Sequence, residues 1–334
     1  MIFSENIVGN QFDYRDSFKY FCLKNCVRQL LSSNIEDSFA YINCVPCIYA
    51  YFSNQLPDGY AIRYNKSPVQ RAYESFFITI EPKQKCVEKN FESILKTIDK
   101  QTPVIAATDG FFLPYKHHYN KYHASHAIII HGYDEVHKNI CVIDCYDQDN
   151  YNGTLSYNDF FVSWSSANPS EANPFSGSPI NNVWSFLKPI NVKKSNKELI
   201  KDTLVNIIET FHGRNGRCFT GLDGLARLKT LLEYRMKTGL DINVERLHKS
   251  LYMYFREKVL LKDYLNVHSD CIESMDLILS SLENNLFCWN VFLTYFLKLS
   301  VLNRAISLDK FNTLFEDIMC NEKQLYDSIS NAIN

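Results

Sequence analysis

The hydrophobic and polar positions divide the chain into two parts with different periodicity. Before residue 193, short apolar runs rich in β-branched and aromatic residues alternate with helical stretches. From Glu198 onward, almost every apolar pattern repeats at three or four residues. The pattern predicts an α+β domain with an antiparallel sheet over residues 1–192 and a helical domain over residues 193–334.

In the first part, the pattern predicts two clear helices and a series of strands. One helix begins near Phe18 in FKYFCLKNCVRQLLSS, and the other covers residues 83–100. Residues 1–17 are polar and irregular, residues 36–52 are helical or mixed, and residues 165–179 are rich in Pro, Ser and Asn and predict a surface loop. Strands are expected at residues 60–64, 74–80, 103–107, 124–133, 139–146 and 183–187. A further strand is expected to begin at residue 153 and to lead into a short helix that ends at residue 164.

In the second part, glycines mark the ends of the expected helices. Gly213, Gly216, Gly221 and Gly239 separate apolar stripes and are typical of helix ends and turns. The expected helices cover residues 198–211, 222–237, 244–265, 271–282, 285–299 and 308–333.

Two runs in the first part, 124–133 and 139–146, predict a β-hairpin that carries unusual polar groups. His126 opens the first run ahead of three isoleucines, and Asp144 closes the second after Cys141-Val142-Ile143. A carboxylate that follows a strand core needs a partner. The folded hairpin could therefore bring an imidazole beside a carboxylate, which are the base and the orienting group of a nucleophilic triad.

Cys22 is the best candidate for the nucleophile that would complete such a triad. It falls at or near the first turn of the first helix, where the helix dipole and N–H groups without an intrahelical acceptor lower a thiol pKa and offer oxyanion donors. Cys26 is the obvious competitor, one turn further into the apolar stripe. There the backbone N–H groups are already bonded within the helix, so Cys22 is favoured.

Other titratable residues nearby have ordinary explanations. His117, His118 and His137 are typical of exposed or hydrogen-bonded histidines, and His131 should point to the other face of the sheet. His123 remains an alternative base if its strand begins earlier. Among the carboxylates, Asp134 and Asp147 rival Asp144, and Asp134 lies in a turn, while Asp109 either caps a turn or helps to bind an amine.

The eleven cysteines are compatible with a reduced protein. Their number is odd and low for a disulfide scaffold, and Cys141, Cys218, Cys288 and Cys320 lie among apolar residues as core cysteines do. Cys22, Cys26, Cys44 and Cys47 could be drawn as a zinc site, but Cys26 belongs to an apolar helix stripe and Pro46 is not in a metal knuckle. We expect no metal or other cofactor.

Composition and charge limit the classes of binding partner that the sequence predicts. The chain has 334 residues, 46% of them hydrophobic, and a formal net charge of −2 without long runs of either sign. This balance gives no reason to expect nucleic acid or a membrane surface as partner. No uninterrupted apolar run is long enough to span a membrane and the N-terminus does not resemble a secretory signal, so we expect a cytoplasmic protein.

The order of these residues is that of papain-like cysteine enzymes: a cysteine at an early helix, then a histidine opening a strand, then an Asp on the next strand. The segments FCLKNCVRQLL, PVIAATDGFFLPY, YHASHAIIIHGYDE and NICVIDCYD, within residues 15–190, resemble the butirosin-biosynthesis acyltransferase family. TGLDGLARLKTLL resembles the C-terminal half of that family. The residue before the family's cysteine is often His, whereas here it is Phe21.

The resemblance implies a papain-like fold that forms amides. Cys22 would be the nucleophile, His126 the general base and acid, and Asp144 the group that orients the imidazole. The acyl group would come from a phosphopantetheine thioester on an acyl or peptidyl carrier protein and pass to a small-molecule primary amine. Residues 111–122, rich in Tyr and Phe, and the helical domain are candidate walls for a channel that excludes water.

Two alternatives remain open from the sequence. A cysteine peptidase or amidase would use the same three residues to hydrolyse an amide. A scaffold or carrier-binding module without activity would not depend on Cys22. The sequence identifies neither the acyl chain nor the amine, and it does not indicate the oligomeric state.

Overall fold

A computed structural model of the chain describes residues 2–3, 22–32, 48–52, 59–64, 77–80, 86–146, 150–171, 173, 175–187, 195–215, 218–302 and 304–333. The chain divides into two compact units, residues 1–42 with 73–191 and residues 43–72 with 192–334. One division between the units falls near residue 192. Residues 43–72, which the sequence analysis assigned to the first domain, are grouped with the second.

The first unit is built on a seven-stranded antiparallel sheet in the order β4-β9-β5-β6-β7-β8, with β1 also paired to β6. The long strands β6 and β7 form the expected hairpin, with a polar turn at residues 135–138. The strands are β1 (Ile2–Phe3), β4 (Phe77–Ile80), β5 (Val104–Asp109), β6 (Ser125–Asp134), β7 (Asn139–Asp144), β8 (Tyr151–Ser156) and β9 (Trp184–Leu187).

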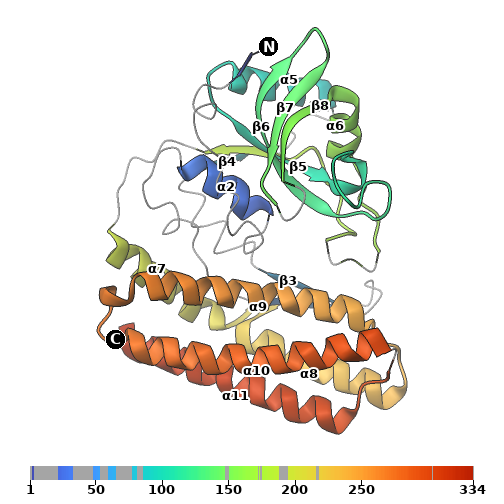
Figure 1. Cartoon of the computed structure of the whole chain (residues 1–334). Helices are drawn as coiled ribbons and strands as arrows, with labels where there is room; N and C mark the ends of the chain where they lie inside the picture. Colours follow the sequence, from blue (N-terminus) through green and yellow to red (C-terminus); the bar gives the residue numbers. More distant parts are fainter. Residues whose placement is uncertain are drawn as a thin grey trace. The chain divides into compact units, whose positions relative to one another are not determined.

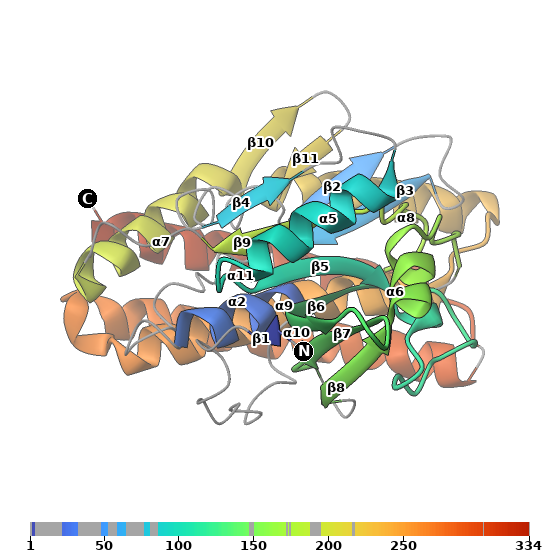
Figure 2. The ribbon, with the colours of Figure 1, turned by 90° about the horizontal axis from the view of Figure 1, so that it is seen from above.

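Helices α2 (Cys22–Ser32) and α5 (Val87–Ile98) lie on opposite faces of this sheet, as Figures 1 and 2 show together. α6 (Tyr157–Trp164) follows β8 directly, with the Ser156 hydroxyl accepting from the Asp159 N–H as its N-cap. α5 and α6 bury apolar side chains against β5, β6 and β7. The core on that face includes Ile94, Ile98, Ile128, Val142, Phe160 and Trp164.

Pairing across the sheet positions the polar residues of interest. His126 is the second residue of β6 and lies opposite Thr108 of β5, while Asp144 is the last residue of β7 and lies opposite Tyr151 of β8. β6 and β7 each have a short central run of buried apolar residues, 127–130 and 140–143, as expected of interior strands that are buried on two sides. The hairpin therefore holds His126 and Asp144 at the same end of two adjacent strands.

The second unit contains a sheet that the helical periodicity did not predict. β10 (His212–Asn215) and β11 (Cys218–Thr220) form a hairpin where glycine turns were expected, and β11 pairs with β2 (Ile48–Phe52), which pairs with β3 (Tyr60–Tyr64). All of these pairs are antiparallel. The expectation of almost only helices, with glycine turns, over residues 193–334 was therefore wrong for residues 212–215 and 218–220.

The described part of the second unit also contains five long helices, and they follow the predicted ranges with one correction. The two expected helices at 271–282 and 285–299 form one continuous helix, α10. Asn285, which was expected to lie at a break, is buried and accepts a hydrogen bond from Lys258 Nζ at 2.8 Å. The helices are α7 (Asn196–Phe211), α8 (Gly221–Thr238), α9 (Val244–Val267), α10 (Met275–Leu302) and α11 (Leu308–Ile333).

Helix α10 is the one described helix that is long and apolar enough to cross a membrane by length and composition. Its residues Ile278, Leu282, Trp289 and Phe292 are buried in the unit. Of these side chains, Trp289 and Phe292 pack in a core shared with α8, α9 and α11.

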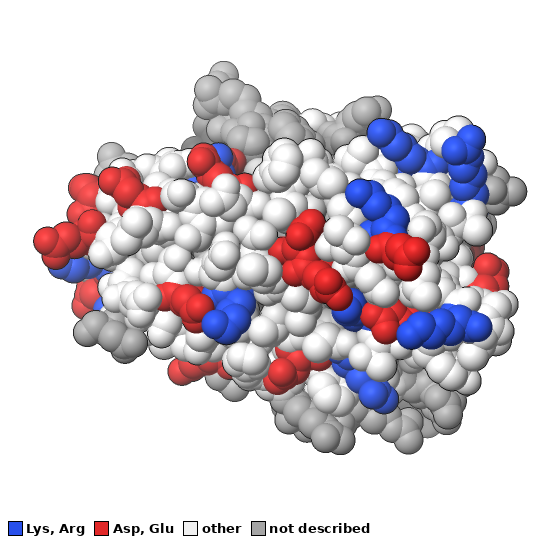
Figure 3. Space-filling model, turned by 90° about the horizontal axis from the view of Figure 1, so that it is seen from below, with Lys and Arg blue, Asp and Glu red and all other residues white. Residues whose placement is uncertain are grey.

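The face of the molecule drawn in Figure 3 shows no dominance of one charge sign. On the face in Figure 3, Lys and Arg are interspersed with Asp and Glu, and wide areas between them carry neither. This mixture agrees with the small net charge of the sequence.

Together the two units give an α+β N-terminal region with an antiparallel sheet, followed by a mainly helical C-terminal region. The fold class expected from the sequence is confirmed.

Candidate active site

Asp144 is the centre of a buried polar cluster in the first unit. Its Oδ2 atom lies 2.7 Å from Nε2 of His126 and 2.8 Å from Nζ of Lys116. Tyr115 donates to the same oxygen at 3.2 Å, and the Tyr146 N–H donates to Oδ1 at 3.2 Å. Burial raises the pKa of Asp144. The charges and hydrogen bonds of His126 and Lys116 together lower it by a larger amount, so the net pKa lies below its ordinary value.

His126 is buried and is held through one ring nitrogen. Burial, the largest single effect, and the charge of Lys116 lower the pKa of His126. The charge and hydrogen bond of Asp144 and the charge of Cys22 together raise it by more, so the net pKa lies above the ordinary value. The Tyr146 ring lies 5.7 Å from the imidazole, centre to centre. Because Nε2 is engaged by Asp144, Nδ1 is the nitrogen left to exchange a proton with another group.

Cys22 is the first residue of α2 and is partly exposed. Burial raises the pKa of the Cys22 thiol, but the positive charge of His126 and a hydrogen bond with that residue lower it, and the net pKa lies below the ordinary value. A backbone hydrogen bond at Ala127 acts in the same direction. His126 therefore acts on the Cys22 thiol and is hydrogen-bonded to Asp144, which indicates that the three side chains lie close together.

Cys26 is only one turn away on α2 but has a different environment. It is 1% exposed, and its thiol donates to the carbonyl oxygen of Ala127 at 3.5 Å. Burial and the neighbouring Cys145 raise the pKa of Cys26 well above its ordinary value. A thiol held in its protonated form is a poor nucleophile, so the environments of the two cysteines favour Cys22.

The other candidate bases and carboxylates that the structure describes pair with each other, away from Cys22, His126 and Asp144. His123 Nδ1 is 2.7 Å from Asp109 Oδ2, and His137 Nδ1 is 2.8 Å from Asp134 Oδ2. Asp134 also accepts backbone N–H groups of the turn that follows it. Asp147 lies outside the described residues.

Asp109 has the role of a turn cap. Its Oδ1 accepts the N–H of Phe111 and of Ala124, each at 3.1 Å, and Ser166 donates to Oδ2 at 2.6 Å. Every polar contact of this carboxylate anchors a loop. An amine-binding role for Asp109 finds no support in this geometry, because the carboxylate is fully buried and already occupied.

Sequence reasoning missed Lys116 and Tyr115, both in the aromatic segment 111–122. The Lys116 side chain is 1% exposed and its ammonium lies 5.7 Å from the Tyr115 ring centre and 5.9 Å from that of Tyr146. Burial and the charge of Asp144 raise the pKa of Tyr115 well above its ordinary value, so its hydroxyl stays protonated and donates to Asp144. The only available signal was the position of a lysine within an aromatic run, and lysines are exposed by default.

Among the described residues, no group of three or more His, Cys, Asp or Glu side chains is placed to hold a metal ion. Two of the four cysteines of the zinc alternative, Cys44 and Cys47, lie outside the described residues.

The chemistry available to the cluster is nucleophilic attack by sulfur. A thiol with a lowered pKa next to an imidazole, which is oriented by a carboxylate, can exist as a thiolate–imidazolium pair. The start of a helix adds N–H groups that have no acceptor within the helix and that suit a developing oxyanion. The antiparallel α+β sheet and this cluster resemble those of papain-like cysteine enzymes.

Comparison with protein families agrees with that class. Residues 48–171 match the model of the Peptidase_C39 like family, so the chain contains a Peptidase_C39-like domain of the papain-like cysteine peptidase type. The matched residues include His126 and Asp144 and begin after Cys22. The search of curated proteins gave no match.

Proposed function

We propose that the chain is an amide-forming acyltransferase of thiotemplated natural-product biosynthesis, with Cys22, His126 and Asp144 as its catalytic triad. The observation that supports nucleophilic acyl transfer is the hydrogen-bonded arrangement of a thiol, an imidazole and a carboxylate in the first unit. The choice of an amine rather than water as acceptor rests on the resemblance to the butirosin-biosynthesis acyltransferase family. The Asn-, Lys-, Tyr- and Ile-rich sequence also resembles the related amide synthetase of closthioamide assembly.

The first half-reaction loads the enzyme. The Cys22 thiolate attacks the thioester carbonyl of an acyl group carried on phosphopantetheine, a new C–S bond forms, and the bond to the carrier sulfur breaks. The leaving thiolate takes the proton from His126 Nδ1, which becomes neutral. Asp144 keeps its hydrogen bond to Nε2 throughout and so fixes the tautomer and orientation of the ring.

The second half-reaction forms the amide. A primary amine attacks the acyl-enzyme carbonyl, neutral His126 accepts the proton that the nitrogen loses, and the Cys22 thiolate departs. Aminolysis requires that water does not reach the thioester first. The aromatic segment 111–122 supplies Tyr115 and Lys116 to the cluster and is a candidate for that exclusion.

The first experiment looks for the acyl-enzyme. Intact-mass spectrometry of the full chain after incubation with an acyl-loaded carrier protein should show one acyl adduct, which peptide mapping places on Cys22. The Cys22→Ala variant should show none, and Cys26→Ala should still load. An adduct that persists in Cys22→Ala would contradict the assignment, and no adduct with any acyl carrier or soluble thioester would favour a chain without acyl transfer activity.

A cysteine peptidase or amidase is the second candidate, and the match to a peptidase family favours it. The two functions differ in what releases the acyl group. With a fixed amount of acyl-enzyme, we expect a primary amine to accelerate loss of the adduct and to give an amide product. Release at the same rate with and without amines, with free acid as the product, would instead identify a hydrolase.

A further inference from the structure

Cys26 is a buried thiol that the proposed reaction does not use. It lies four residues after Cys22 in α2 and is 1% exposed. Its thiol donates to the carbonyl oxygen of Ala127 at 3.5 Å, and Cys22 has a backbone hydrogen bond with the same residue. Both sulfurs are therefore held against one residue of β6, which directly follows His126.

The spacing of the two cysteines suits a disulfide after a small adjustment. Residues four apart in a helix lie one turn apart, with their Cα atoms about 6 Å and their Cβ atoms about 5 to 6 Å from each other. A disulfide joins Cα atoms about 4.4 to 6.8 Å apart, but it needs Cβ atoms only about 4 Å apart. Cys22 can make this approach because it begins the helix, where the backbone N–H groups have no acceptor within the helix.

The two thiols differ in their reactivity towards an oxidant. A peroxide reacts with a thiolate rather than a thiol, so it attacks Cys22, which is partly exposed and has a lowered pKa. Cys26 stays protonated, because burial and its neighbours raise its pKa well above the ordinary value. The negative charge of Cys22 is one of those raising effects. Oxidation of Cys22 removes that charge, so Cys26 then loses its proton more readily.

We propose that Cys26 is a resolving cysteine: a peroxide oxidises Cys22 to a sulfenic acid, and Cys26 captures it as a Cys22–Cys26 disulfide. This role rests on the part of the proposed function that makes Cys22 a reactive thiolate, and not on the acyl group or the amine. The disulfide occupies the nucleophile, so acyl loading stops while the oxidant is present. A dithiol reductant restores the thiol, whereas an uncaptured sulfenic acid proceeds to a sulfinic acid that thiols do not reduce.

Both steps balance with the peroxide as the only oxidant. The Cys22 thiolate attacks one peroxide oxygen, an S–O bond forms, the O–O bond breaks, and the released hydroxide takes a proton from His126 to give water. The Cys26 sulfur then attacks the Cys22 sulfur, an S–S bond forms and the S–O bond breaks, and the hydroxide leaves with the Cys26 proton as a second water. Capture competes well with further oxidation because the two sulfurs lie within one helical turn, so the step is intramolecular.

Cys145 is the competing partner for Cys26. It is 2% exposed, and its charge also raises the pKa of Cys26, so the two thiols lie near each other. Burial and the charge of Asp144 raise the pKa of Cys145 to about 12, which keeps it a thiol that a peroxide does not attack. A disulfide forms at the sulfur that is oxidised first, and that sulfur is Cys22. The structure therefore favours the Cys22–Cys26 bond over a bond between the two buried thiols.

Disulfide mapping of the full chain tests the proposal without any acyl substrate. The reduced protein is treated with hydrogen peroxide, blocked with N-ethylmaleimide in denaturant and digested with trypsin. Cleavage after Lys24 places Cys22 in the peptide of residues 20–24 and Cys26 in that of residues 25–28. We expect these two peptides to be linked after peroxide and to separate after dithiothreitol.

Recovery of the Cys22 thiol tests the resolving role. After peroxide and then dithiothreitol, iodoacetamide labelling of Cys22 should return to its starting level in the unmodified chain. In Cys26→Ser the labelling should stay at least about fivefold lower, because thiols do not reduce a sulfinic acid. Cys145→Ser, the matched control at the other buried thiol, should recover as the unmodified chain does.

A link between Cys26 and Cys145, a link between two chains through Cys22, or recovery no better in the unmodified chain than in Cys26→Ser would each overturn the proposal. The mapping uses the unmodified chain, so its outcome does not depend on the folding of a variant. A chain that forms the Cys22–Cys26 link but loads no acyl group contradicts the proposed acyl transfer alone. A chain that loads Cys22 but forms no such link contradicts the resolving role alone.

Discussion

Asp144 in the first unit and Glu322 in the second are both buried carboxylates that hold a buried lysine. Lys116 Nζ lies 2.8 Å from Asp144 Oδ2, and Lys258 Nζ lies 2.8 Å from Glu322 Oε1. Each carboxylate also accepts a tyrosine hydroxyl, from Tyr115 at 3.2 Å and from Tyr254 at 3.1 Å. By burial and charge pairing alone, the two clusters are equivalent.

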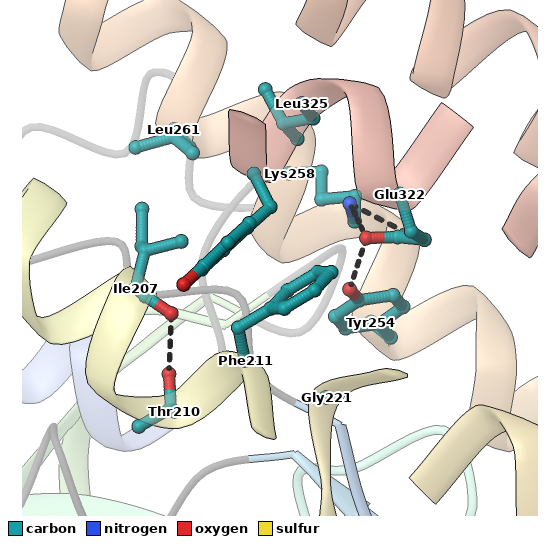
Figure 4. Close-up of a pocket in the computed structure, with 10 residues that line it drawn as sticks. Ile207, Thr210, Phe211, Gly221, Tyr254, Lys258, Leu261, Glu322 and Leu325 are labelled. Atoms are coloured by element: carbon teal, nitrogen blue, oxygen red, sulfur yellow. Dashed lines mark hydrogen bonds and ion pairs between the residues drawn. The ribbon is translucent and has the colours of Figure 1, made fainter. Parts of the chain in front are cut away.

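They differ in their remaining partners. Asp144 binds His126, which in turn contacts the partly exposed Cys22. Glu322 accepts the Trp289 indole N–H at 2.6 Å, and Lys258 donates to Asn285. Figure 4 shows the Lys258 amine turned toward Glu322 and Tyr254, beside a pocket lined largely by apolar and aromatic side chains.

The difference shows that a buried ion pair does not by itself indicate a reactive site. Around Glu322, neither the indole nor the amide changes protonation near neutral pH, and no thiol takes part. Around Asp144, an imidazole and a thiol with shifted pKa values can exchange a proton. We therefore expect changes at the first cluster to affect reactivity and changes at the second to affect stability.

The largest expected effect is the loss of reactivity on removal of the sulfur of Cys22. Cys22→Ala should lower acyl transfer from a soluble thioester by a factor on the order of 10⁴ or more, because no other group forms the acyl-enzyme. Cys26→Ala, which removes a buried thiol one turn away, should retain most of the rate. The rates can be followed with a thiol-release assay, and equal losses in the two variants would remove the distinction between them.

The second largest effect should be on stability, at Glu322. Glu322→Gln leaves the Lys258 charge buried without its counter-charge, which costs about 3 to 5 kcal/mol of unfolding free energy. Glu316→Gln is the matched control on the same helix, since Glu316 pairs with Lys229 at 3.1 Å on the surface, and should cost about 1 kcal/mol or less.

Urea unfolding measures both variants, and iodoacetamide labelling of Cys22 in the folded state should proceed at the unmodified rate in each. A Glu322→Gln protein as stable as its control would show that the second cluster contributes no more than a surface ion pair.

A third test uses two histidines of strand β6 to separate burial from charge pairing. His126 is buried beside Asp144 and its pKa is raised, whereas burial alone lowers the pKa of His131 from 6.5 to about 4. Between these two values the unfolded chain binds more protons at residue 131 than the folded chain does. Stability due to His131 is therefore complete above pH 6.5 and is lost as the pH falls toward 4, by about 3 kcal/mol in total.

The measurement compares urea unfolding of the unmodified chain and His131→Gln at several pH values from 7.5 to 4.5. The variant lacks the titrating group, so its stability should fall less on acidification. Parallel pH profiles for the two proteins would show that His131 is not the source of the acid sensitivity.

The positions of the three predicted site residues could be read from local patterns. The β-branched runs around Ile128–Ile130 and Cys141–Ile143 predict two strands, and the short polar turn between them makes the strands adjacent, which places His126 near Asp144. The apolar stripe that starts after Cys22 predicts the helix and its first turn. Each of these inferences depends on fewer than about 25 consecutive residues.

Structural features that depend on contacts between residues far apart in the sequence could not be predicted from local patterns. β2 and β11 pair although about 170 residues separate them, and short strands between glycines in a helical region carry little periodic signal. The pair Asn284-Asn285 is typical of a helix break, but Asn285 stays in α10 because Lys258 donates to it. Lys116 was missed for the same reason, since its burial depends on a carboxylate 28 residues further along the chain.

The smallest expected effect concerns Lys116, which we regard as a positioning residue. Its charge lowers the pKa of His126 while that of Asp144 raises it. Lys116→Met should therefore raise the His126 pKa further and move the alkaline limb of acyl transfer from a soluble thioester to higher pH, because the leaving thiolate takes its proton from protonated His126.

The acid limb should stay in place, because Lys116 is not among the groups that shift the pKa of Cys22. At the optimum pH, the rate should fall roughly tenfold or less, since the His126–Asp144 hydrogen bond remains. Lys121→Met, an exposed lysine in the same segment, should leave the profile unchanged. A lower rate with both limbs unmoved would mean that Lys116 only packs against Tyr115 and Tyr146, and that the charge of the first cluster, like that of the second, serves stability alone.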